Sequence, residues 1–233
     1  LTYTFSFSQN TWYHFALVLS SNVWTLYING TSVGTNADSS TFAASASTLF
    51  IGRANSSGSS YFYGNLSNIR INTTAVYTSN FTPSTAPLTA ITNTVLLMCQ
   101  SNRLIDNSSN NIAISVGAGS PSVQRFSPFN PTASYSTATI GGSGYFDGTG
   151  DYLTLSPGSA FAFGTGDFTI EAWVYLGAAA ADQHIIDSRN ASQTTNWVWG
   201  WAAGTSSGTL GLVVPIPTFC EVSIVMAVVP LLV

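Results

Sequence analysis

Short strand-like segments separated by tight turns are the feature of this sequence that most constrains its fold. The stretch "TWYHFALVLSSNVWTLYING", residues 11–30, holds two runs of aromatic and aliphatic residues, with a Ser-Ser-Asn turn between them and Asn29-Gly30 at its end. Asn and Gly favour such turns because they adopt left-handed backbone conformations at low cost. No segment shows a convincing 3.6-residue period, which an amphipathic helix would require. The sequence therefore predicts an all-β protein.

Comparable segments recur at short intervals along most of the chain. We expect strands at residues 2–7, 12–19, 23–28, 48–52, 66–71, 94–99, 112–116, 143–147, 151–155, 167–175, 183–187, 196–202 and 209–214. Many short strands joined by turns that contain Gly and Asn are typical of antiparallel sandwiches. We therefore predict two antiparallel β-sheets packed face to face.

The strand at 12–19 is apolar on both of its faces. Successive side chains of a strand point to opposite faces of the sheet. One face carries Trp12, His14, Ala16 and Val18, and the other carries Tyr13, Phe15, Leu17 and Leu19. A strand of this kind belongs inside a layered structure, so most of these aromatic side chains are expected in the core. The alternative to a core position, for Trp12 and His14, is that they contact a ligand.

The charge of the chain argues against a nucleic-acid partner. Charged residues make up 6% of the 233 residues, the net charge is −4, and the five cations are scattered Arg residues. Neutralising phosphates requires clustered Lys or Arg. The 45% of hydrophobic residues nevertheless provides ample apolar surface to bury. We expect a folded domain whose surface polarity comes from Ser, Thr and Asn.

Five motifs together resemble the concanavalin A-like lectin/glucanase superfamily, in its laminin-G-like subgroup. They are "FDGTGDYLTL" (146–155), "FTIEAWVY" (168–175), "WYHFALV" (12–18), "LYINGTSVG" (26–34) and "LFIGR" (49–53). The resemblance implies an antiparallel jelly-roll sandwich of the concanavalin A type. The motifs cover most of the chain apart from its last residues.

The order of these motifs differs from the order in the family, where "FDG" and "FTIEAW" precede "WYH" and "LYING". We interpret residues 1–86 as the C-terminal half of one sandwich, 87–93 as a connector and 94–215 as the N-terminal half of a sandwich. The two halves are either parts of neighbouring tandem domains or a single circularly permuted domain. We predict that they complete one another, because each alone would leave an open sheet edge and an apolar face.

The last residues, 216–233, are almost entirely apolar. A membrane-spanning helix needs about 20 uninterrupted apolar residues. Pro217, Glu221 and Pro230 interrupt this run. We therefore expect an apolar tail of uncertain register and no membrane span.

Catalysis is not expected, although the superfamily includes glucanases. Retaining glucanases use two carboxylates about 5–5.5 Å apart. On one strand this requires acidic residues at alternate positions, but Glu171 is followed by Ala172 and Trp173. His184, near Asp182 and Asp187, is more consistent with a solvated pair than with a catalytic or metal-binding group.

Calcium is the metal that the resemblance suggests, because laminin-G-like and lectin domains often bind it at a loop rim. Asp147 and Asp151 flank a Gly-Thr-Gly turn and are the candidate ligands. Ca²⁺ takes six to eight oxygen ligands, and such a turn can present carbonyl groups. We favour the other interpretation, in which Asp147 starts the turn and Asp151 caps it without a metal ion.

Glycan binding is the function that the resemblance implies. Sugars stack on aromatic rings while polar side chains bind their hydroxyl groups. The candidate ligand-binding residues are Tyr61 and Tyr63 in one loop and Trp197, Trp199 and Trp201 on one strand face. The tryptophans are either an exposed platform or core residues, and in a sandwich we favour the core.

These observations predict a non-catalytic laminin-G-like module that recognises a carbohydrate or a cell-surface ligand. We expect it to be part of a larger adhesion or virion-type protein, such as a phage structural protein with tandem repeats, and to be extracellular or virion-associated. The alternative is a purely structural spacer domain, and a glucanase-type hydrolase is the third interpretation.

Overall fold

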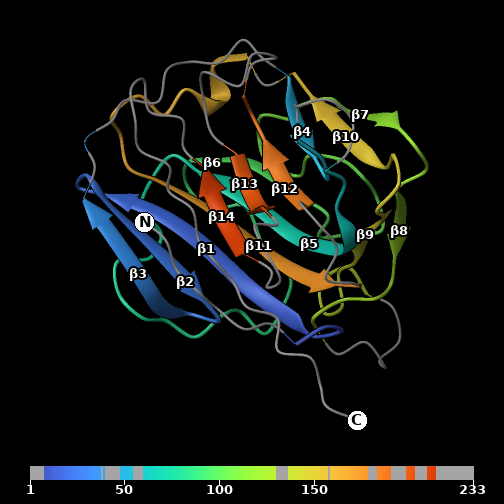
Figure 1. Ribbon diagram of the computed structural model, residues 1–233, viewed down its shortest axis with the longest axis horizontal. Coiled ribbons are helices and arrows are strands. Elements are labelled where there is room, and N and C mark those ends of the chain that lie inside the picture. Colours follow the sequence, from blue (N-terminus) through green and yellow to red (C-terminus); the bar gives the residue numbers. More distant parts are fainter. Residues whose placement is uncertain are drawn as a thin grey trace.

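Two antiparallel β-sheets packed face to face form the protein in its computed structural model (Figure 1). The structure describes residues 8–37, 39, 48–54, 60–129, 136–156, 158–177, 183–189, 198–202 and 209–213. The expected strand at 2–7 and the apolar tail at 216–233 lie outside these residues. In the described part, the predicted all-β, concanavalin A-like sandwich is confirmed.

The larger sheet has eight strands. Its order is β3 (Thr31–Ala37), β2 (Val23–Ile28), β1 (Trp12–Ser20), β11 (Phe168–Leu176), β5 (Tyr63–Asn72), β9 (Ser143–Asp147) and β8 (Ser122–Gln124), and β6 (Thr94–Met98) also pairs with β5. The centre of this sheet is therefore the trio β1, β11 and β5, on which the candidate site is built.

The smaller sheet has six strands. Its order is β14 (Thr209–Val213), β13 (Val198–Ala202), β12 (Gln183–Asp187), β4 (Leu49–Ile51), β10 (Tyr152–Leu155) and β7 (Ile114–Ala118). A short 3₁₀ turn, η1 (Gly158–Phe161), precedes β11. Among the described residues, no helix is long and apolar enough to cross a membrane.

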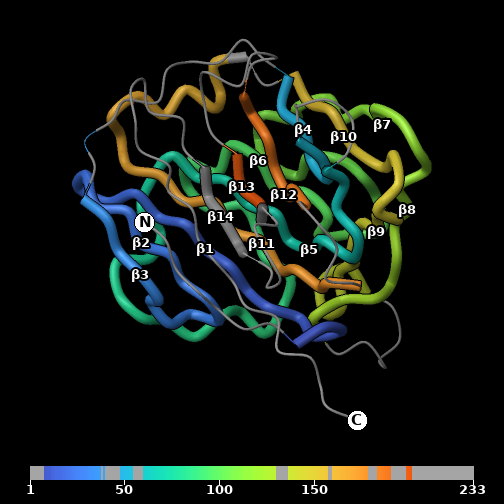
Figure 2. The backbone as a smooth tube through the Cα atoms, in the orientation of Figure 1, coloured from blue at the N-terminus to red at the C-terminus, as the bar shows by residue number. Residues whose placement is uncertain are grey.

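Both sheets draw their strands from the two ends of the chain. In the larger sheet, β11 lies between β1 and β5 and pairs with each of them in antiparallel fashion. In the smaller sheet, β4 pairs with both β10 and β12. The tube view shows this mixing of early and late segments within each layer (Figure 2). The division of the chain at 87–93 stays a prediction about the domains of a parent protein.

The core lies between the sheets and follows the alternation predicted from the sequence. Strand β1 contributes Tyr13, Phe15, Leu17 and Leu19, and β11 contributes Phe168, Ile170, Ala172 and Val174. These side chains meet buried aliphatic residues of β4 and β10 from the smaller sheet. Since burial of apolar area is the main driving force for folding, this shared core stabilises both sheets together.

The outer face of β1 is covered by an irregular segment, residues 73–93. Ala16 and Val18 of β1 pack with Tyr27 of β2, and Tyr77 and Phe81 of this segment cover them. The rings of Tyr77 and Phe81 are stacked, with centroids 3.6 Å apart. Strand β1 is therefore buried on both faces, as its sequence predicts, but its outer cover is a loop instead of a second sheet.

Gly30 fixes the position of this covering segment. It has a positive φ of 78°, and its carbonyl oxygen accepts a hydrogen bond of 2.9 Å from the Phe81 amide. A Cβ atom at Gly30 would collide with the Phe81 carbonyl. Only glycine fits, because it tolerates both the left-handed conformation and the close approach.

Most predicted strands are confirmed within one to three residues at their ends. Strands β2, β9 and β12 have the predicted bounds, and β5 is extended at its start to Tyr63. The strands β3 and β8 were not predicted from the sequence. Strand β3 ("TSVGTNA") is largely polar, and β8 has only three residues, so neither carries an alternating apolar signal.

Candidate functional site

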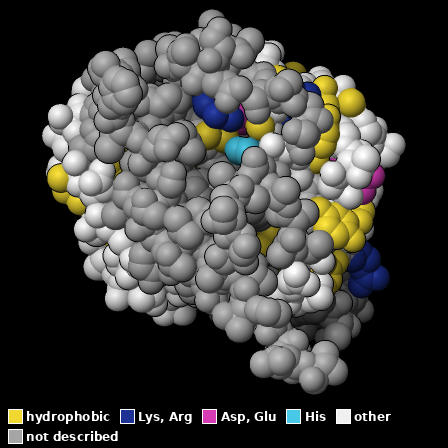
Figure 3. Space-filling model, in the orientation of Figure 1, with side chains coloured by type: hydrophobic (Ala, Val, Ile, Leu, Met, Phe, Trp, Pro, Cys, Tyr) yellow, Lys and Arg dark blue, Asp and Glu magenta, His cyan; other side chains and the backbone are white. Residues whose placement is uncertain are grey.

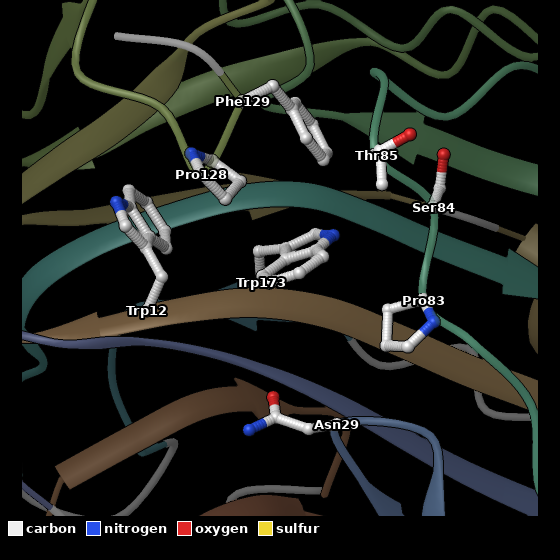
Figure 4. Close-up of a pocket in the computed structure, with 8 residues that line it drawn as sticks. All are labelled: Trp12, Asn29, Pro83, Ser84, Thr85, Pro128, Phe129 and Trp173. Carbon is white, nitrogen blue, oxygen red and sulfur yellow. The ribbon is translucent and has the colours of Figure 1, made fainter.

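A pocket opens on the outer face of the larger sheet (Figure 4). It has a volume of about 510 Å³ and is lined by Trp12, Asn29, Pro83, Ser84, Thr85, Pro128, Phe129 and Trp173. The neighbours of the two tryptophans along their strands, Tyr13, Ala172 and Val174, belong to the core, so both indoles lie on the opposite face of the sheet. The volume is within the range of about 300–1,000 Å³ that is usual for small-molecule sites.

Pairing of β1 with β11 brings the two tryptophans to one surface. His14 is opposite Trp173 and Trp12 is opposite Tyr175, so Trp12 and Trp173 are diagonal neighbours on the same face. Trp12 also contacts Tyr175 and Phe126, with ring centroids 5.4 and 5.3 Å apart. Both indoles are half-buried, which leaves part of each available to a ligand.

The remaining walls come from a hairpin turn and from irregular segments. Asn29, at the turn after β2, accepts a 2.9 Å hydrogen bond from the His14 amide through Oδ1. Residues 83–85 of the covering segment form the side opposite Trp12 (Figure 4). Buried Phe129 meets Trp173 edge to face, with centroids 5.5 Å apart. Aromatic and proline rings therefore surround Trp173, and amide and hydroxyl groups lie at the rim.

Two indole N–H groups of this pocket are buried without a hydrogen-bond partner. They are the Nε1 atoms of Trp12 and Trp173. In the close-up, the Trp173 nitrogen is at the end of the ring that faces Ser84 and Thr85 (Figure 4). An unpaired buried donor costs about 1–3 kcal/mol. A ligand oxygen placed at Trp173 would remove that cost.

A buried ionic cluster lies beneath the covering segment, next to the pocket. Glu171 of β11 accepts hydrogen bonds from Arg70 Nε at 2.7 Å, His14 Nε2 at 3.0 Å and Tyr77 Oη at 2.9 Å. Arg70 also donates to the Thr89 carbonyl at 3.0 Å. The His14 ring contacts Trp173 at 5.2 Å, so the cluster supports the floor of the pocket.

The cluster keeps Glu171 ionised. Burial alone would raise the pKa of Glu171, but the hydrogen bond from His14 and the Arg70 guanidinium outweigh burial and hold the pKa below its usual range. Burial, together with the negative charge of Glu171, raises the pKa of Tyr77, which stays a neutral donor. Both carboxylate oxygens of Glu171 are occupied by donors of the protein itself. The arrangement orients β1, β5 and β11 relative to the covering segment.

The candidate calcium ligands Asp147 and Asp151 lie close together at the turn between β9 and β10. Asp151 is buried, and its two oxygens accept hydrogen bonds from the Ser120 and Asp147 amides at 2.5 and 3.1 Å. Exposed Asp147 accepts one from the Thr149 amide at 2.7 Å. These bonds match the turn-stabilising interpretation. Within the described part, no three His, Cys, Asp or Glu side chains group to hold a metal, and calcium stays a prediction.

Tyr61 and Tyr63 lie apart from the pocket. Tyr61 is half-buried beside Tyr152, at 6.5 Å between ring centroids, and Arg53 stacks over the Tyr152 ring at 4.5 Å. The space-filling view shows hydrophobic side chains next to a cationic one over β4 and β10 (Figure 3). The Tyr63 ring packs against Gly148 and Gly177. Neither tyrosine is therefore among the described residues that line the pocket of Trp12 and Trp173.

The three tryptophans of the predicted stripe differ in what the structure describes. Trp199 is fully buried in the core and meets Phe15 edge to face at 6.3 Å. Trp197 lies outside the described residues, and only the backbone of Trp201 is described. The described member of the stripe therefore occupies a core position. The two cysteines also differ in what the structure describes. Cys99 is a buried free thiol, and Cys220 lies outside the described part.

Sequence reasoning found one wall of the pocket and missed the rest. The sequence gives Trp12 as an alternative ligand contact, but it does not single out Trp173. Pro83, Ser84 and Thr85 lie just before the predicted connector at 87–93, in a stretch for which the sequence predicts no strand. The Pro-Ser-Thr composition gives no signal for a pocket wall, because the path of an irregular segment depends on tertiary contacts.

The comparison with protein families supports the resemblance. Residues 1–79, about a third of the chain, match a family model described as the concanavalin A-like lectin/glucanases superfamily. The comparisons with curated proteins and with solved structures gave no match. The family match contains β1 to β5, and so it includes Trp12 and Asn29 of the pocket.

Proposed function

We propose that this sandwich, whose residues 1–79 match the concanavalin A-like superfamily, is a non-catalytic module that binds carbohydrate in the Trp12–Trp173 pocket. The observation that carries the proposal is the composition of the pocket. Two half-buried indoles can stack on sugar rings, and Asn29, Ser84 and Thr85 can bind hydroxyl groups. As part of the same proposal, the module serves surface recognition in a larger extracellular or virion-type protein.

The absence of catalysis is part of this proposal and rests on how Glu171 is held. Glu171 is the carboxylate next to the pocket, and Arg70, His14 and Tyr77 occupy its oxygens. A glycosidase needs one carboxyl group to give a proton to the substrate and a second to act as nucleophile or base. A carboxylate with a lowered pKa, enclosed by three donors, suits neither role.

The test is a glycan array followed by titration of the bound saccharides into the 233-residue chain. We expect Trp12→Ala to weaken binding about 5- to 150-fold, because it removes an aromatic stacking surface of the kind worth about 1–3 kcal/mol per stacked ring. Tyr61→Ala is the matched control, since it removes a half-buried aromatic from the other candidate patch. Circular dichroism verifies that both variants fold.

Two outcomes would contradict the proposal. Loss of binding in Tyr61→Ala but not in Trp12→Ala would move the ligand site to the patch of Tyr61, Tyr152 and Arg53. Failure of the wild-type chain to bind any saccharide would favour the alternative, a structural spacer with no ligand.

A further inference from the structure

The described residues that line the pocket carry no charge. None of its eight described lining residues is acidic, basic or a histidine. In the buried ionic cluster beside it, Arg70 and Glu171 neutralise each other through a hydrogen bond of 2.7 Å and an ion pair of 2.5 Å. A ligand carboxylate or sulfate would lose its hydration there without gaining a counter-charge, and this is unfavourable.

Most polar groups of the pocket can donate a hydrogen bond to a ligand. Indole nitrogens can only donate, and Trp173 Nε1 is buried and unpaired. Asn29 Oδ1 already accepts from the His14 amide, so its NH₂ group is the part left for a ligand. Ser84 Oγ donates to the Ala86 carbonyl at 2.6 Å and accepts from the Ala86 amide at 3.2 Å, which leaves it one further acceptor position. Such a set fits the hydroxyl and ring oxygens of an uncharged sugar.

No carboxylate lies among the described groups that line the pocket, so none is available there to hold a bridging calcium ion. The candidate calcium ligands Asp147 and Asp151 are on the turn between β9 and β10, and neither lines the pocket. Sugar recognition in the pocket would then depend on direct stacking and hydrogen bonding alone. Removal of calcium should leave it unchanged.

We propose that the Trp12–Trp173 pocket selects uncharged pyranosides over their acidic counterparts and needs no metal ion to do so. This inference rests on the proposed carbohydrate-binding function and specifies its ligand class. Stacking on the indoles supplies affinity for the apolar face of the ring, and the Trp173 N–H group selects an acceptor oxygen at one edge. The uncharged walls exclude uronic acids and sialylated or sulfated ends.

The experiment compares pairs of saccharides that differ only in one group, a hexoside and its uronic acid, by isothermal titration with EDTA and with CaCl₂. We expect the neutral member to bind at least tenfold more tightly, with the same affinity in both buffers. Trp173→Phe keeps an aromatic ring but removes the N–H donor, and should weaken binding of the neutral sugar about tenfold.

A second variant does not depend on replacing a half-buried residue. Thr85 is exposed at the rim, so Thr85→Lys should fold and should raise the affinity for the uronic acid at least fivefold. Thr85→Gln is the uncharged control and should leave the preference for the neutral sugar intact. If Thr85→Lys did not have this effect, something other than charge would keep the acid out of the pocket. That result would contradict the inference.

The two proposals fail in distinguishable ways. Suppose that Trp12→Ala still abolishes binding. Equal or tighter binding of the acidic saccharide, or loss of binding in EDTA, would then overturn the ligand class but not the proposed function. If no saccharide bound, or if binding survived in Trp12→Ala, the proposed function itself would fail and this inference with it.

Discussion

Replacing Glu171 with Gln tests whether the buried ionic cluster stabilises the centre of the larger sheet. The two side chains have nearly the same shape, so the change removes a charge without creating a cavity. Glu171 is fully buried, and Arg70 is 5% exposed. The variant therefore leaves a guanidinium in the interior with no counter-charge.

The expected cost comes mainly from Arg70. Breaking a buried ion pair by removing one partner costs about 3–5 kcal/mol. Gln can still accept one hydrogen bond from Arg70, and the Tyr77 hydroxyl can rotate to accept one from the new amide. We therefore expect the lower end of the range, about 3 kcal/mol. With a urea dependence of about 2–3 kcal/mol per M, the unfolding midpoint should fall by about 1–1.5 M.

The sign of the pH dependence follows from the lowered pKa of Glu171. A carboxyl group with a lower pKa in the folded state contributes stability above its unfolded value, here 4.5, and loses it as the pH falls through the folded pKa. Wild type and Glu171→Gln should therefore differ most in stability above pH 5, and the difference should narrow below pH 4.5.

Urea unfolding followed by tryptophan fluorescence, at pH 7 and at pH 4, measures both effects. Asp167→Asn is the matched control, because Asp167 accepts one exposed hydrogen bond from the Ser21 amide. We expect the control to change stability by about 0.5 kcal/mol or less. If Glu171→Gln cost less than about 1 kcal/mol at pH 7, or if its deficit grew at pH 4, the reasoning from an ionised, paired carboxylate would be refuted.

Three further predictions concern the turns and the thiol. Gly30→Ala forces a side chain into a positive φ and against the Phe81 carbonyl. It should lower the free energy of unfolding by at least about 1 kcal/mol and Tm by at least about 2–4 °C. An unchanged Tm would contradict the role of Gly30 in holding the covering segment in place. Asp151→Asn sets an NH₂ group against the Ser120 or Asp147 amide and should cost about 1–3 kcal/mol in chemical unfolding, whereas exposed Asp147→Asn should cost less. Cys99 is fully buried and burial raises the pKa of its thiol to about 12, so in a Cys220→Ser background it should react with a thiol reagent only after denaturation; rapid reaction of the native chain would mean that the core opens.

The layer structure of the sandwich could be predicted because it depends on a period of two. The alternation in β1 and β11 separates core residues such as Phe15 and Ile170 from outer residues such as His14 and Glu171, and the structure has the same separation. The motif resemblance adds the sheet architecture. Strand β3 escaped prediction because its stability comes from pairing with β2, which its own polar sequence does not reveal.

The ionic cluster shows why site geometry was harder to predict. The alternation along β11 separates Glu171 from Ile170 and Ala172, but the sequence does not reveal which cation meets it. Arg70 lies opposite Glu171 in the β11–β5 pairing, and the register shifts just beyond, between Glu171 and Trp173. Asn68 occupies a left-handed conformation at this irregularity, with φ of 53°. A slip of one residue would turn Arg70 to the core face, and no local pattern fixes that register.

The pocket depends on both ends of the chain, and this has a consequence for any fragment of it. Trp12 and Asn29 come from the segment before the covering loop, whereas Phe129 and Trp173 come from the segment after it. The floor exists only where β11 pairs with β1, and β11 in turn needs β5 as its other neighbour. A fragment ending at residue 86 would keep one indole and lose the strand that carries the other. Saccharide binding would therefore report on completion of the sheet as well as on the ligand, and it should appear only when both segments are present together.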